Sequence, residues 1–327
     1  MKKAILSLLL QLFCAAGFSQ NLPLKPFGEP FRRADLDVIW NAPTNALPAA
    51  YWVYRVRSAT FSPALISYLM ALGSLTENDR TNLTKSPLQD TNAVLFLSPD
   101  QSRMLWLYPP QGALEYDSQR LTPYGPTHLA EGVPPESQLF QLTTNFLPRL
   151  GINVSELSGK DRSTEPRFHF FASQVMYFVN HSFITNVESR GVRFRRLVDG
   201  MEFNGDGGNC EIDFGEHGKV VKLSLSWREL EHYRRYAAAP LATVTKWIRD
   251  GRGVVFKLSD GILDWPAVKR VTVTEVTPVW LGEQQAESQE FVHPLVRLTA
   301  NIDTGEAKIA AIIWCPIIDE SRPLKGK

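Results

Sequence analysis

Few residues of this 327-residue chain have the types and spacing that catalysis or ligand binding requires. The sequence contains no His-Glu-x-x-His metalloprotease motif, no Gly-x-Ser-x-Gly nucleophile elbow, no phosphate-binding P-loop and no Cys-x-x-Cys pair. Each of these motifs holds reactive or ligating side chains at a fixed spacing on a defined turn or helix. Their absence weighs against the commonest enzyme classes, and we predict no catalytic residue, no metal site and no cofactor.

Arg193 and Arg195 are the best candidates for ligand binding. They lie two residues apart in a segment that alternates between apolar and basic residues, as a half-buried strand does. On a strand both guanidinium groups project from the same face, and two such groups can converge on a carboxylate or phosphate. The pattern therefore predicts an anion-binding site at these two arginines, and a solvated strand face is the alternative.

Two further segments could bind a cation, although each has a simpler interpretation. Glu229 and His232 are three residues apart, so a helix would direct both side chains toward one metal ion. A solvated charged face is the alternative there. The segment Asn204–Asn209 is rich in oxygen ligands but lacks the alternating acidic residues and final glutamate of an EF-hand loop. A plain hairpin turn is the preferred interpretation of that segment.

Acidic and aromatic side chains offer two other kinds of site. Two carboxylates about 5–9 Å apart can hydrolyse a glycosidic bond, and four acidic residues are close in sequence: Asp199, Glu202, Asp206 and Glu211.

Exposed aromatic residues can mark a partner surface, and four tryptophans lie near predicted element ends or loops: Trp40, Trp52, Trp106 and Trp265. Packing in the core is the alternative for these tryptophans, with Trp40 docking on the body of the protein.

Residues 1–19 read as a secretory signal peptide. Lys2 and Lys3 form a basic start, the apolar run Ala4–Phe13 follows, and small residues precede a cleavage site after Ser19. The run is shorter than the about 20 residues that span a bilayer, and no later window is long and apolar enough to do so. We therefore expect an extracytoplasmic protein, periplasmic or secreted, without a transmembrane segment after signal removal.

Signal cleavage would leave Cys210 and Cys315 as the cysteines of the mature chain. An even pair in an oxidising compartment suggests a disulfide, which would be worth roughly 4–5 kcal/mol in the chain-entropy model. Two buried thiols that pack as small apolar side chains are the alternative.

Composition and charge fit an ordinary globular protein. The chain has 35 Lys and Arg against 34 Asp and Glu, with 44% hydrophobic residues. Such a nearly neutral chain lacks the basic surface of a general nucleic-acid-binding protein, so we expect no nucleic-acid partner.

Apolar residues at helical spacing predict three helices, over Phe61–Leu72, Glu136–Leu150 and Pro240–Asp250, each followed closely by a glycine. Segments with strand character follow each helix. They include the aromatic-rich stretch Arg167–Asn180 and a predicted hairpin of Cys210–Phe214 and Lys219–Ser226. After an extended lead-in over 20–50, the repeated order divides the chain into units at 51–133, 134–236 and 237–327. We predict an α+β fold of tandem helix-plus-antiparallel-sheet units.

The last unit carries a family resemblance. The stretch Leu295–Lys308, with its turn Asp303-Thr304-Gly305-Glu306, resembles the final hairpin of PepSY-type domains. The segments Thr277–Trp280 and Phe291–Pro294 resemble strands of extracytoplasmic regulators of the YycH and YycI type. The resemblance implies PepSY/cystatin-like helix-plus-sheet units that act by contacting other proteins.

These observations favour a non-catalytic binding or regulatory protein. Its expected partner is a protein or peptide, contacted by strand addition to an exposed sheet edge. An extracytoplasmic hydrolase with a diffuse carboxylate site is one alternative. A small-ligand carrier with a cavity between helix and sheet is another.

Overall fold

The structure is a computed structural model that describes residues 35–43, 47–81, 93–109, 112–121, 124–125, 127–157, 169–205, 207–258, 267–282 and 289–324. The predicted signal peptide, residues 1–19, and much of the lead-in over 20–50 lie outside these ranges. Within them, no helix has the length and apolar character needed to cross a membrane.

The chain forms two compact units, each assembled from separate segments. Unit 1 comprises Met1–Asn45, Ala239–Val276 and Arg297–Pro316, and unit 2 comprises Ala46–Ala238, Thr277–Val296 and Ile317–Lys327. One boundary, between Ala238 and Ala239, lies two residues from the predicted boundary at 237, and none falls at 134. Each unit also contains segments that are distant in sequence.

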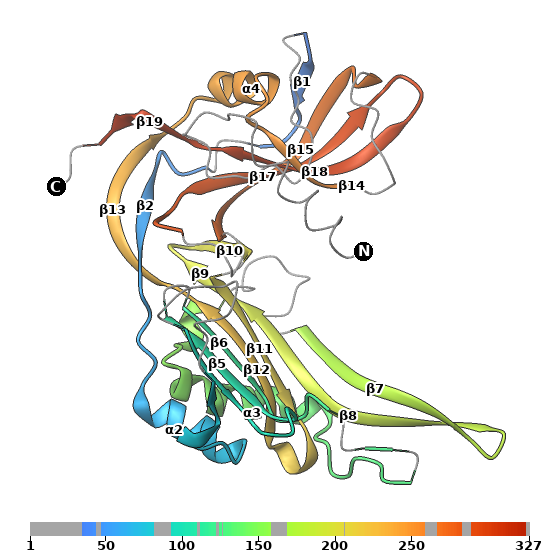
Figure 1. The fold of residues 1–327 in the computed structure, drawn as a ribbon. Coiled ribbons are helices and arrows are strands. Elements are labelled where there is room, and N and C mark those ends of the chain that lie inside the picture. The colour runs from blue at the N-terminus through green and yellow to red at the C-terminus, as the bar shows by residue number, and fades with distance from the viewer. Residues whose placement is uncertain are drawn as a thin grey trace, which may run out of the picture. The chain divides into compact units, whose positions relative to one another are not determined.

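An eight-stranded antiparallel sheet dominates unit 2 (Figure 1). In spatial order its strands are β3 (Arg80–Thr81), β4 (Val94–Leu97), β5 (Met104–Tyr108), β6 (Ala113–Asp117), β12 (Val220–Trp227), β11 (Gly208–Phe214), β8 (Ser182–Arg195) and β7 (His169–Val179). Side chains alternate between the two faces along each strand. One face is therefore apolar, whereas the other carries charged residues such as Asp117, Lys222 and Asp213, which lie directly opposite one another on neighbouring strands.

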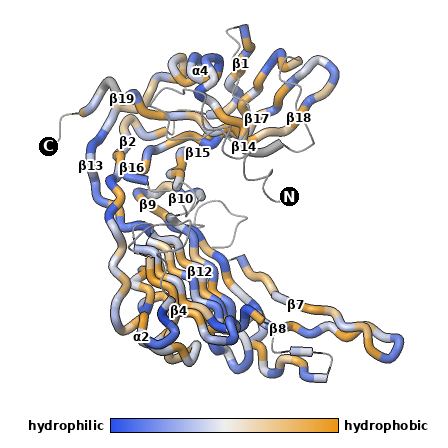
Figure 2. The backbone as a smooth tube through the Cα atoms, viewed as in Figure 1, coloured by the Kyte–Doolittle hydropathy of each residue, from blue (hydrophilic) through white to orange (hydrophobic). Residues whose placement is uncertain are grey.

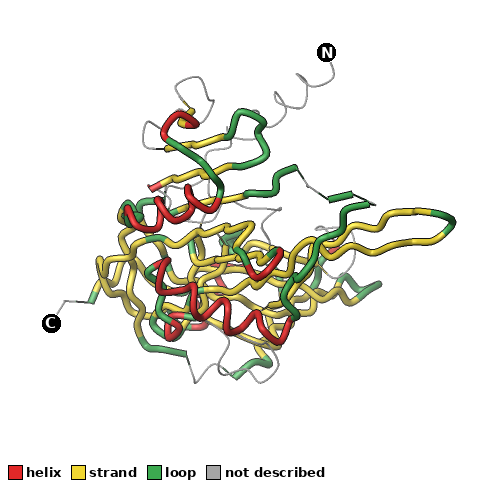
Figure 3. Tube along the Cα trace, turned by 90° about the horizontal axis from the view of Figure 1, so that it is seen from below, coloured by secondary structure: helices red, strands yellow, loops and turns green. Residues whose placement is uncertain are grey.

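Two helices, α2 (Pro63–Leu72) and α3 (Glu136–Phe146), pack against the apolar face. The helices are drawn in red in Figure 3. Ser62 caps α2 by accepting a hydrogen bond from the Leu65 amide at 3.2 Å. Leu69 and Leu139 are fully buried against sheet residues such as Leu223. Short 3₁₀ turns cover Glu77–Asp79, Leu147–Leu150, Val154–Glu156 and Glu216–Gly218.

A second sheet of unit 2 has four strands, in the order β16 (Phe291–Val292), β2 (Ala50–Arg57), β13 (Glu229–Ala238) and β19 (Ile318–Pro323). Between β8 and β11 along the chain, β9 (Leu197–Val198) and β10 (Met201–Gly205) form a short hairpin. Strand β10 also pairs in parallel with residues 279–282 of β15 (Arg270–Gly282).

Unit 1 places helix α4 (Leu241–Arg249) beside a sheet. Its strands follow the order β14 (Val254–Leu258), β18 (Lys308–Pro316), β17 (Pro294–Asp303) and β15, with β1 (Asp37–Trp40) added in parallel to β15. The Trp40 indole donates a hydrogen bond to Thr245 of α4 at 2.8 Å, and Arg249 donates one to the Leu36 carbonyl at 2.7 Å. The prediction that Trp40 docks on the body of the protein is confirmed.

The predicted fold class, α+β in tandem helix-plus-antiparallel-sheet (PepSY/cystatin-like) units, is wrong. The described chain is mostly β, with three α-helices and large sheets. The predicted helices are confirmed, but β6 pairs with β12 and so joins strands of the first two predicted units into one sheet. Because α2 and α3 then share a single core, a repeat of independent helix–sheet units does not describe the chain.

Candidate functional site

Arg193 and Arg195, the predicted anion site, each face a carboxylate of the protein itself. Two nitrogens of Arg193 donate to Glu211 at 2.9 and 2.5 Å. Arg195 donates to Glu202 at 2.7 Å and to the Asn204 side chain at 3.3 Å. The two guanidinium groups therefore have separate internal counter-ions, and an external anion would have to compete with both.

The two candidate cation segments are not built for a metal in the part of the chain that the structure describes. Glu229 and His232 lie on strand β13, where residues three apart point to opposite faces. Glu229 instead accepts a hydrogen bond from the Thr60 amide at 3.1 Å. The segment Asn204–Asn209 connects β10 to β11, which belong to different sheets, so it is no hairpin turn. No cluster of ligating side chains that could hold a metal ion occurs among the described residues.

Three of the four acidic residues considered for hydrolysis are described by the structure, and each has a different partner. Glu202 and Glu211 are engaged by the arginines described above, and Asp206 lies outside the described residues. Asp199, in the turn between β9 and β10, accepts a hydrogen bond from the Tyr54 hydroxyl. Each described carboxylate thus serves a different local interaction.

Cys210 and Cys315 are free, buried thiols that lie in different units. Burial raises the pKa of both thiols, that of Cys315 to about 12. Their state matches the alternative interpretation, in which the cysteines pack as small apolar side chains.

A polar cluster that sequence patterns did not suggest links three elements of unit 2. The buried Tyr54 hydroxyl contacts both Asp199 and the Nε2 atom of His232, the latter at 3.1 Å, and the Tyr54 ring meets Trp280 edge-on with 5.0 Å between centroids. Burial and the neighbouring Asp199 carboxylate both raise the pKa of Tyr54. A phenol kept neutral in this way donates a stable hydrogen bond, so the cluster holds β2, β13 and the β9–β10 turn together.

The polar face of the large sheet contains one buried carboxylate, Asp213, which is 5% exposed. Its Oδ2 atom accepts a hydrogen bond from Ser189 at 3.3 Å, and its Oδ1 atom has no partner among the described residues. Burial, followed by the like charge of Glu211, raises the pKa of Asp213 to about 6, although Lys222 opposes this shift. The ionised form of Asp213 therefore destabilises the folded sheet. Because the side chain is buried, it is not accessible to a substrate in solvent.

The clearest candidate for function is a β-hairpin arm, defined here as residues Gln174–Val187 of β7 and β8. The two strands extend beyond the rest of the large sheet (Figure 1). A two-residue turn joins them at Asn180 and His181, which have φ angles of 48° and 64°, as a type I′ hairpin requires.

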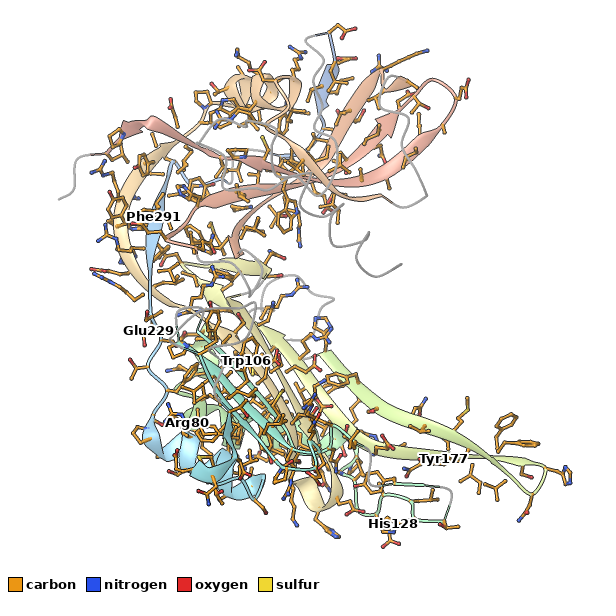
Figure 4. All side chains as sticks on the ribbon, viewed as in Figure 1. Arg80, Trp106, His128, Tyr177, Glu229 and Phe291 are labelled. Atoms are coloured by element: carbon orange, nitrogen blue, oxygen red, sulfur yellow. The ribbon has the colours of Figure 1, made fainter. Side chains whose placement is uncertain are left out.

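The arm exposes large apolar side chains. Met176 is 66% exposed, Phe178 63% and Phe183 72%. Phe178 and Phe183 are cross-strand partners whose ring centroids lie 5.0 Å apart. Apolar stretches of the arm are visible in Figure 2, and its side chains, including the labelled Tyr177, are drawn in Figure 4. Exposed apolar groups concentrated in this way mark an interaction surface.

The arm also presents an unprotected sheet edge. Strand β7 is the last strand of the eight-stranded sheet, and no other described strand pairs with its outer side. Natural edge strands usually carry lysine, proline or a bulge that prevents pairing with other chains. The 11 residues of β7 include no Lys, Arg, Asp, Glu or Pro, and the bulge of this hairpin falls on β8 at Glu188. The edge is therefore open to an added strand.

The base of the arm is held firmly in unit 2. The ring of Phe171 covers Gly191, its cross-strand partner, so closely that a Cβ at Gly191 would lie 2.2 Å from it. Arg193 lies over the same ring at 5.7 Å, and Asn186 accepts a hydrogen bond from the Ala130 amide at 2.9 Å. A rigid base allows the exposed part to be presented in one orientation.

The tryptophans considered as a partner surface do not form it. Trp40, Trp52 and Trp106 are partly buried, and Trp265 lies outside the described residues. The sequence predicted β7 as an aromatic-rich strand. The signal that could have indicated exposure is the absence of charge from Phe168 to Val187 in a strand with apolar residues on both faces.

Comparisons with known proteins identify no family. No family model matches the chain, and no curated protein matches it. Among solved structures, the chain is similar to an uncharacterized protein from Eubacterium rectale, with 9% sequence identity and a TM-score of 0.45 over 89% of this chain and 90% of that chain. Such a likeness assigns neither a fold nor a function, and the resemblance to PepSY-type domains stays a prediction from the C-terminal residues.

Proposed function

We propose that this chain is an exported, non-catalytic binding protein that contacts a protein or peptide partner by strand addition at the outer edge of β7. The observation that carries this proposal is an 11-residue edge strand that contains no Lys, Arg, Asp, Glu or Pro and whose exposed side chains include the large apolar residues Met176 and Phe178. Both parts of a strand-addition site are then present: backbone groups for affinity and side chains for specificity.

The backbone geometry of the hairpin supports this proposal. In a two-residue hairpin the residues that flank the turn, Val179 and Ser182, form a hydrogen-bonded pair. Odd-numbered residues of β7 therefore direct their N–H and C=O groups toward β8. The even-numbered residues from Ala172 to Phe178 direct theirs toward the outer edge, where a partner strand would bind them.

The exposed side chains lie on the same residues that offer these backbone groups. Met176 and Phe178 are even-numbered and lie on one face of β7, and Phe183 extends that apolar face onto β8. A partner strand with apolar residues at alternate positions would cover Met176 and Phe178 while it completes the hydrogen-bond ladder. We infer that partner choice depends on this face.

Photo-crosslinking in the source organism tests the proposal. A photoreactive phenylalanine analogue replaces Phe178, and a matched control places it at Leu121, another exposed apolar residue of unit 2. Gln174→Pro supplies the edge-blocked form, because the Gln174 N–H faces outward and its loss leaves the β7–β8 ladder intact. Circular dichroism checks that this variant folds.

We expect a defined adduct from position 178 that is absent from position 121 and lost in Gln174→Pro. Mass spectrometry then identifies the joined peptide. An adduct that survives in Gln174→Pro, or equal labelling from both positions, would refute strand addition at β7.

A further inference from the structure

Strand β7 carries two aromatic pairs at equal distances from its centre, and this symmetry suggests which chain supplies the added strand. The central residue is Gln174, with five residues on either side. At equal distances from it, Phe170 matches Phe178 and Phe171 matches Tyr177, whereas the other three pairs differ in kind: Ala172 and Met176, Ser173 and Val175, and His169 and Val179.

We propose that the partner of β7 is β7 of a second copy of this chain, paired antiparallel across a twofold axis at Gln174. This inference rests on the proposed function, because it names the occupant of the same edge. A twofold interface presents one surface to itself, and a strand whose aromatic residues are symmetric about its centre suits such an interface.

The backbone alternation is compatible with this register. Pairing about Gln174 places even-numbered residues opposite even-numbered residues, so outward-facing groups meet outward-facing groups. The three central outward-facing residues of each copy, Ala172, Gln174 and Met176, would then make about six backbone hydrogen bonds in total. A typical protein interface has about ten.

The side chains favour this register over its neighbours. With Gln174 at the centre, Phe170 lies opposite Phe178 of the second copy, and Phe171 lies opposite Tyr177. Cross-strand aromatic pairs contribute about 0.2–1 kcal/mol each. A shift of two residues in one direction places Phe178 opposite Ala172 and Tyr177 opposite Ser173, so these aromatic pairs are lost. A shift of two in the other direction places Tyr177 opposite His169 and Phe170 opposite Met176, so fewer ring pairs remain within β7.

Charge and area fit a second copy that binds reversibly. Two identical strands place like charges near each other unless the strand is neutral, and β7 contains no Asp, Glu, Lys or Arg. A strand of this length and about 10 Å of sheet thickness bury about 400 Å² per copy. A standard interface needs about 800 Å² per partner, so we expect a dimer in the micromolar range.

Charge exchange at the axis is the first test. Gln174→Lys and Gln174→Glu each place two like charges opposite one another, so each variant alone should dimerise about fivefold more weakly than the wild type. An equimolar mixture pairs Lys with Glu and should recover the affinity of the wild type. Analytical ultracentrifugation measures the dissociation constants, and a merely structural role of Gln174 would show no recovery on mixing.

Disulfide formation is the second test. Opposing residues of a hydrogen-bonded pair have Cα atoms about 5.5 Å apart, within the range that a disulfide spans. Gln174→Cys should therefore form a covalent dimer under mild oxidation. Met176→Cys is the matched control, since its mate lies about 14 Å away along the strand. Cys210 and Cys315 are buried and do not interfere.

A wild-type protein that stays monomeric at high micromolar concentration, or equal crosslinking of both cysteine variants, would overturn the self-pairing. The photo-crosslink at Phe178 separates the two proposals. An adduct with β7 of a second copy supports both. An adduct with a different protein refutes self-pairing but supports strand addition, and no adduct refutes both.

Discussion

Replacement of the buried carboxylate Asp213 by asparagine should stabilise unit 2 in a pH-dependent way. The pKa of Asp213 is about 6, against an ordinary value of 3.8, because burial and then Glu211 disfavour its ionised form. The folded state thus holds a proton between pH 3.8 and 6 that the unfolded state releases. Stability due to this group is greatest below pH 3.8, falls as pH rises through that window, and stays low above about pH 6.

The magnitude follows from the shift of about 2 pKa units, each worth about 1.4 kcal/mol. Asp213→Asn removes the ionisation but keeps an oxygen that can accept the hydrogen bond from Ser189. Its gain in the free energy of unfolding should therefore be about 3 kcal/mol larger at pH 8 than at pH 3.5. Comparison between the two pH values cancels any effect of the substitution that does not depend on protonation.

Urea denaturation at a series of pH values measures this difference, with hydrogen exchange of peptides from β11 to assign the transition to unit 2. Glu131→Gln removes one negative charge from an exposed residue of unit 2 and serves as the control. We expect its effect to vary by less than about 0.5 kcal/mol across the series. A gain for Asp213→Asn that is equal at both pH values would refute the argument that burial governs this group.

Three further variants or measurements test the packing. Gly112→Ala should destabilise unit 2 by about 2–4 kcal/mol in urea denaturation, because Gly112 has a φ of 61° and a Cβ would lie 2.5 Å from the Trp227 carbonyl oxygen. Leu139→Ala should cost about 2–5 kcal/mol in the same assay, since this fully buried side chain of α3 would leave a cavity; a cost below 1 kcal/mol would contradict the shared core. Cys210 and Cys315 should resist a thiol reagent in the folded protein and react on unfolding, and rapid labelling of native protein would contradict their burial.

Local structure was predictable from the sequence, because it depends on signals within a few residues. Helix α3 begins after Pro135 and is followed by a turn that ends at Gly151, which has a φ of 72°. The hairpin of β11 and β12 was also predicted correctly. The tandem architecture was not, since it depends on which strands pair at long range. The register that places Asp117 opposite Lys222 joins segments that no local pattern relates.

The candidate site was predictable only in part. A strand with aromatic residues was expected over Arg167–Asn180, and β7 occupies most of it. Whether Phe178 is covered or exposed depends on what packs above it, which the strand's own sequence does not determine. The same limit applies to His232. Its spacing from Glu229 would place both side chains on one face of a helix, but on strand β13 they point to opposite faces.

Each unit is assembled from three separate segments of the chain, which affects folding during synthesis and the folding of truncated chains. Asp37 of β1 binds Arg270, a partner 233 positions later, so at about 5–20 residues per second β1 emerges roughly 10–50 s before the strand it joins. Until α4 emerges, Leu36 and Trp40 also lack their partners Arg249 and Thr245, so for most of that interval this segment is accessible to chaperones. Since residues 277–296 and 317–327 belong to unit 2, a stop codon anywhere before 317 leaves that unit incomplete as well.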